Sequence, residues 1–71
     1  MSPNDRNQLN YIVGQAAINH AYREALLNQE SRRAVLDSCD LSPYVRDQIL
    51  KMGSYQHLST LASDLFNRYF H

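Results

Sequence analysis

The chain has 71 residues and carries seven basic and seven acidic side chains, so its formal net charge is zero. Nucleic-acid-binding proteins usually have a basic excess that neutralises phosphates, and this balance argues against nucleic acid or an anionic membrane surface as the main partner. A chain of this length is expected to form one domain, residues 1–71. Such a domain buries only about 60–65% of its unfolded surface. A partner or a second copy would therefore add apolar burial that the monomer lacks.

The sequence also bears on the compartment. Cys39 is the only cysteine, so an internal disulfide is excluded, as is common in a reducing compartment. No apolar run approaches the ~20 residues that span a bilayer. The polar N-terminus has no hydrophobic signal core behind it. We therefore expect a soluble, cytoplasmic protein without membrane contact.

The first 27 residues predict one long helix. Ser2 and Pro3 are typical of a helix start. Gly14 costs about 1 kcal/mol relative to alanine and does not by itself end a helix. Two apolar stripes follow each other, the second rotated by about half a turn relative to part of the first: Leu9, Ile12, Val13, Ala16 and Ala17, then Ile18, Tyr22, Ala25 and Leu26. A helix that is apolar on two sides either lies under other elements or offers a second face to a partner.

A shorter helix is expected next, over residues 29–38. Asn28 is a suitable N-cap, and Glu30 lies where the helix dipole favours an acid. The helix should bury Ala34 and Val35, with Leu36 at the margin. Arg32 and Arg33 should point outward into solvent.

Residues 41–53 contain a start signal, an apolar stripe and a stop signal. The Ser42 side chain is expected to accept from a first-turn backbone N–H, with Pro43 at the first helical position. Val45, Ile49 and Met52 recur at helical spacing, and Leu50 widens the stripe. Gly53 should end the helix in the left-handed conformation.

The last helix is expected from Tyr55 to about Tyr69, with Ser54 as its cap. Its period is the clearest in the chain and is formed by Leu58, Leu61, Ala62, Leu65 and Tyr69, broadened by Phe66 and Phe70. No strand pattern is present. The predicted fold is all-α, a compact bundle of about four helices, two longer and two short.

The sequence contains no recognisable catalytic or metal-binding pattern. His20, His57, His71 and Cys39 are scattered, without the close spacing that a metal site requires. No base is placed to activate the thiol, and no glycine-rich phosphate loop is present. We therefore predict no catalytic residue, no cofactor and no metal, and a protein that is not an enzyme.

The five tyrosines are more informative. Tyrosine is favoured at interfaces because it combines apolar area with a polar tip, although a tyrosine can also simply border a small core. The candidate partner-binding residues are Tyr11, Ile18, Tyr22 and Tyr55. The two helices between 42 and 70 also permit a helix-turn-helix interpretation, but Arg68 is the only cation on the second of them and lies at its far end.

Residues 22–65 resemble a known small helical fold. The resemblance lies in the segment 22–27, the helix ending at Leu36, the Asp40-Leu41-Ser42-Pro43 turn, and the segment 49–54 with Leu58 and Leu61. It is similar to the small subunits of extradiol dioxygenases of the protocatechuate 4,5-dioxygenase type, and to helical recognition domains of ribosomally made peptide precursors, including the borosin-binding domain. In the dioxygenases the metal and catalytic residues belong to the large subunit, so the resemblance implies no catalytic residue here.

Three functional hypotheses follow. The first is a non-enzymatic protein–protein interaction module, an accessory or recognition subunit for a larger enzyme or a homo-oligomer. The second is a leader or recognition domain of a ribosomally made peptide precursor. The third, which the charge balance disfavours, is a helix-turn-helix nucleic-acid binder.

Overall fold

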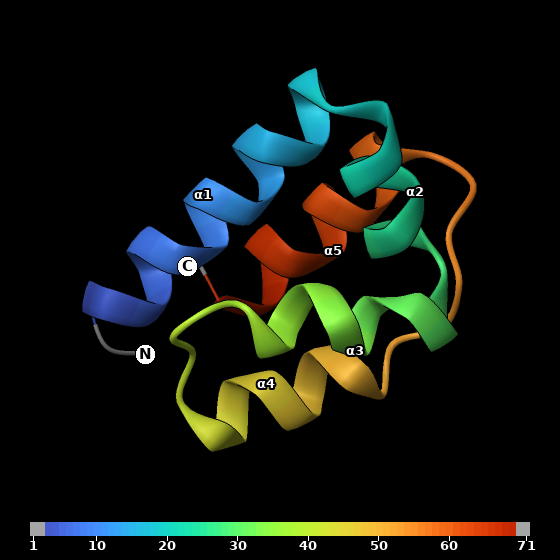
Figure 1. Cartoon of the computed structure of the whole chain (residues 1–71). Coiled ribbons are helices and arrows are strands. Elements are labelled where there is room, and N and C mark those ends of the chain that lie inside the picture. The colour runs from blue at the N-terminus through green and yellow to red at the C-terminus, as the bar shows by residue number, and fades with distance from the viewer. Residues whose placement is uncertain (1–2, 70–71) are drawn as a thin grey trace.

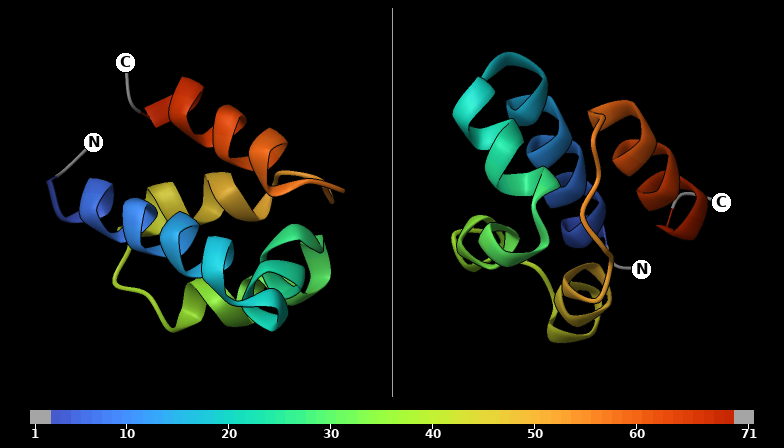
Figure 2. Two further views of the ribbon diagram at one scale, coloured as in Figure 1. Left: turned by 90° about the horizontal axis from the view of Figure 1, so that it is seen from above. Right: turned by 90° about the vertical axis from the view of Figure 1, so that its right-hand side faces the viewer.

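The computed structural model describes residues 3–69, which form five helices without a strand (Figure 1). They are α1 (Pro3–Ile18), α2 (His20–Leu27), α3 (Gln29–Asp37), α4 (Pro43–Leu50) and α5 (Leu58–Tyr69). The all-α prediction is confirmed, whereas the expected count of about four helices is one too low. The helix α1 contacts α2 and α5, and α3 contacts α2 and α4 (Figures 1 and 2).

The additional helix arises because the predicted long first helix breaks at Asn19. This residue is extended, and its side chain accepts a hydrogen bond from the Tyr22 N–H at 3.0 Å as the N-cap of α2. The Arg23 guanidinium donates to the Ala16 carbonyl oxygen at 3.1 Å and so satisfies the last turn of α1. The break redirects the chain, which lets the apolar residues of α2 reach the same core as those of α1.

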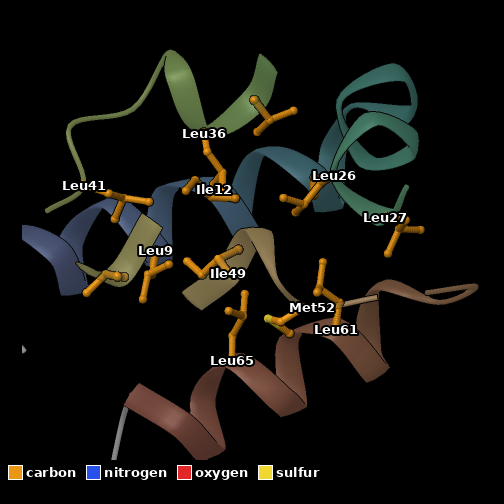
Figure 3. Packing of buried hydrophobic residues seen from close by; sticks show 13 residues of the cluster. Leu9, Ile12, Leu26, Leu27, Leu36, Leu41, Ile49, Met52, Leu61 and Leu65 are labelled. Carbon is orange, nitrogen blue, oxygen red and sulfur yellow. The ribbon is translucent and has the colours of Figure 1, made fainter. Parts of the chain in front are cut away.

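All five helices contribute to one hydrophobic core (Figure 3). Its buried members are Leu9, Ile12, Ala16, Leu26, Leu27, Val35, Leu36, Leu41, Val45, Ile49, Met52, Leu61 and Leu65. The predicted stripes of α4 and α5 are therefore confirmed at their central positions. Ala34, which the sequence predicts to be buried, is exposed because the buried face of α3 is taken by Arg32, Val35 and Leu36.

The prediction that Arg32 points into solvent is wrong, because this side chain is completely buried. Its five N–H groups donate to five main-chain carbonyl oxygens at 2.7–3.3 Å, those of Leu26, Leu27, Ile49, Met52 and Gly53. The carbonyls of Leu26, Leu27 and Ile49 lie in the last turns of α2 and α4, where helix carbonyls lack partners within the helix and carry partial negative charge. Those of Met52 and Gly53 lie in the loop that follows α4. Burial lowers the pKa of Arg32. Arg33 is exposed, as predicted.

The helix α4 begins at Pro43 as expected, but Ser42 does not cap it through its side chain. Instead, the N–H and the hydroxyl of Ser42 both donate to the buried carboxylate of Asp5, each at 2.8 Å. Asp5 lies in the first turn of α1, so this contact attaches the start of one helix to the start of another. Ser42 therefore does not form the capping bond to the first turn of α4 that its sequence position predicts.

The connection between α4 and α5 also differs from the prediction. Gly53 does not adopt the left-handed conformation, and α4 ends three residues earlier, at Leu50. The Ser54 hydroxyl accepts from the Gln29 N–H at 3.0 Å, so it caps α3 instead of the last helix. The Tyr55 N–H donates to the Leu27 carbonyl oxygen at 2.9 Å, which holds the loop 51–57 against the end of α2. The helix α5 therefore begins at Leu58, three residues later than predicted. The predicted positions Phe70 and His71 lie outside the described residues.

Candidate interaction surface

One side of α1 presents large apolar side chains to solvent. Ile18 is 81% exposed and Tyr11 is 57% exposed. They are seven residues apart, close to two turns, and therefore lie on the same side of the helix. We call this side the α1 outer face and define it by Asn7, Tyr11, Gly14, Ala17 and Ile18, all of which are exposed.

The α1 outer face contains no charged side chain. The segment 7–19 has no Asp, Glu, Lys or Arg at any position. Gly14 lies between the two large side chains, and a Cβ placed on it would meet no atom within 4 Å. The face therefore consists of two apolar side chains flanking a stretch of accessible backbone.

The arrangement of the helices explains why none of the other described helices covers the α1 outer face. The opposite side of α1 carries Leu9, Ile12 and Ala16, which are buried against the core. Within the described residues, α1 packs against α2 and α5, and it forms one outer edge of the molecule (Figures 1 and 2). A helix with one face in the core and a second apolar face outside is typical of an element with an additional partner.

Tyr22, a further candidate from the sequence, lies on α2, which packs against α1. Its side chain is half-buried against the core, and its hydroxyl is the buried side-chain oxygen without a hydrogen-bond partner among residues 3–69. Burial raises the pKa of Tyr22 to about 12, with the nearby Cys39 thiol and Tyr11 phenol adding to the shift. Because its polar tip points inward, Tyr22 borders the core and does not belong to the α1 outer face.

Tyr55 is also half-buried and lies on the loop before α5. Its hydroxyl donates to an Asp64 carboxylate oxygen at 2.5 Å, and this bond, together with burial, raises the pKa of Tyr55. The Arg32 guanidinium carbon lies 6.0 Å from the centre of the Tyr55 ring. The structure therefore exposes two of the four predicted contact residues, Tyr11 and Ile18, on one side of α1 and places the other two, Tyr22 and Tyr55, in separate structural roles.

A shallow hollow lies beside Tyr55, between the α2–α3 corner and the loop 51–57. Its two serines are already bonded within the chain: Ser54 accepts from the Gln29 N–H, and Ser31 donates to the Ala25 carbonyl oxygen. The Asn28 side chain caps α3. These three side chains already form hydrogen bonds that support the fold, and we assign no ligand to the hollow.

Tyr44 is a third strongly exposed apolar residue, 72% exposed in the first turn of α4. Its neighbours Pro43 and Asp47 are also exposed, and Asp47 carries a charge. Tyr44 is therefore a single aromatic residue near a charged side chain, unlike the uncharged α1 outer face. Tyr44 is not among the candidates predicted from the sequence, because the exposure of a tyrosine depends on which helix faces pack together.

Within residues 3–69, no group of three or more His, Cys, Asp or Glu side chains is close enough to hold a metal ion. In the same part of the chain, no helix has the length and apolar character needed to cross a membrane. Comparison of the chain with protein-family models, with curated proteins and with solved structures found no match.

Proposed function

We propose that this chain is a helical protein–protein interaction module and that the α1 outer face is its contact surface. The observation that carries the proposal is the 81% exposure of Ile18 and the 57% exposure of Tyr11 on one uncharged side of α1. Exposed apolar side chains that lie together mark interaction sites more often than scattered ones do.

The role of this surface as a contact site has an energetic basis. Burying an Ile side chain fully contributes about 1.5–3 kcal/mol, and aromatic residues such as tyrosine are enriched among the residues that dominate binding energy. The accessible backbone at Gly14 lets a partner helix approach closely. The accessory-subunit role implied by the sequence resemblance requires such a surface and no catalytic group.

The test compares the wild-type chain with two variants that place an aspartate at a strongly exposed apolar position. Ile18→Asp alters the α1 outer face, whereas Tyr44→Asp alters α4 and serves as the matched control. Each tagged variant is incubated with extract of the native host to which an untagged copy of the chain has been added. Circular dichroism checks that both variants remain helical.

We expect a protein that is retained by the wild type and by Tyr44→Asp to be lost with Ile18→Asp. A retained enzyme would indicate the accessory role, and a retained untagged copy would indicate self-association. Retention of the same proteins by all three baits would overturn the assignment of the α1 outer face.

A further inference from the structure

We draw no further inference here: the strongest candidate, the exposed apolar patch of Tyr11 and Ile18 on the outer side of α1, is the surface already proposed as a contact site, and nothing in the described part of the chain shows what covers it.

Discussion

Arg32 and the α1 outer face reverse the usual distribution of polar and apolar residues. A guanidinium is completely buried on α3, whereas Ile18 on α1 is 81% exposed. The arginine is buried because each of its five N–H groups has a main-chain carbonyl partner, at the end of α2 or α4 or in the loop that follows α4. The isoleucine is exposed because the core is already closed by the opposite side of α1. Burial in this small domain thus follows from which partners the fold provides, not from residue class alone.

The two regions therefore have different expected roles. The bonds of Arg32 join α2, α3 and α4, so this residue acts on stability. The α1 outer face makes no comparable bond within the described residues and is available for association. Substitutions that separate stability from association test this division.

The largest effect is expected for Arg32→Ala. The change removes the guanidinium donors of five main-chain carbonyls, of which those of Leu27 and Ile49 keep a backbone donor. It should cost about 3–5 kcal/mol in unfolding free energy, which approaches the whole stability of a small domain. Urea denaturation followed by circular dichroism measures it. Arg33→Ala removes an exposed neighbour of the same type and should change stability by about 0.5 kcal/mol or less. Equal losses in the two variants would contradict the role assigned to Arg32.

Asp5→Ala should have the next largest effect. It leaves the N–H and the hydroxyl of Ser42 without their carboxylate partner, and the cost should be about 1–3 kcal/mol. The exposed Asp47→Ala is the control and should stay within about 0.5 kcal/mol of wild type. The same denaturation experiment detects the difference, and an unchanged midpoint for Asp5→Ala would show that the α1–α4 attachment contributes little.

A smaller effect is expected at high pH. The folded chain raises the pKa of Tyr22 to about 12, whereas an unfolded tyrosine titrates near pH ~10. Between these values the unfolded state loses its proton first, so the stabilisation present below pH ~10 is lost as the pH rises towards ~12. Tyr55 shifts in the same direction, and Tyr22→Phe isolates the contribution of Tyr22. Denaturation midpoints between about pH 8 and 12 should fall less steeply in the phenylalanine variant.

The smallest effect is a gain. Gly14→Ala should stabilise the monomer by about 0.5–1 kcal/mol, because alanine favours the helix and its Cβ enters open space. Thermal unfolding at low concentration, where the monomer predominates, measures the gain. Gly53→Ala also enters open space but lies outside a helix and should gain less. A destabilised Gly14→Ala would show that the α1 outer face is constrained within the monomer.

The sequence alone determined those features that depend on neighbours along the chain. The Asn28 cap, the start of α4 at Pro43 and the buried stripe of Val45, Ile49 and Met52 follow from local hydrogen bonding and helical spacing, and the structure confirms them. Tyr11 and Ile18 could be placed on one helix face for the same reason. Their exposure could not be predicted from that spacing, since it depends on which side of α1 the other helices cover.

Only the tertiary structure decided the features that join distant positions. Ser42 bonds Asp5 across 37 residues, Arg32 bonds Gly53 across 21, and Ser54 caps α3 across 25. Each of these side chains had a reasonable local role that a distant partner replaced. The physical reason is that a buried polar group must be bonded, and in a compact chain the partner that satisfies it need not be close in sequence.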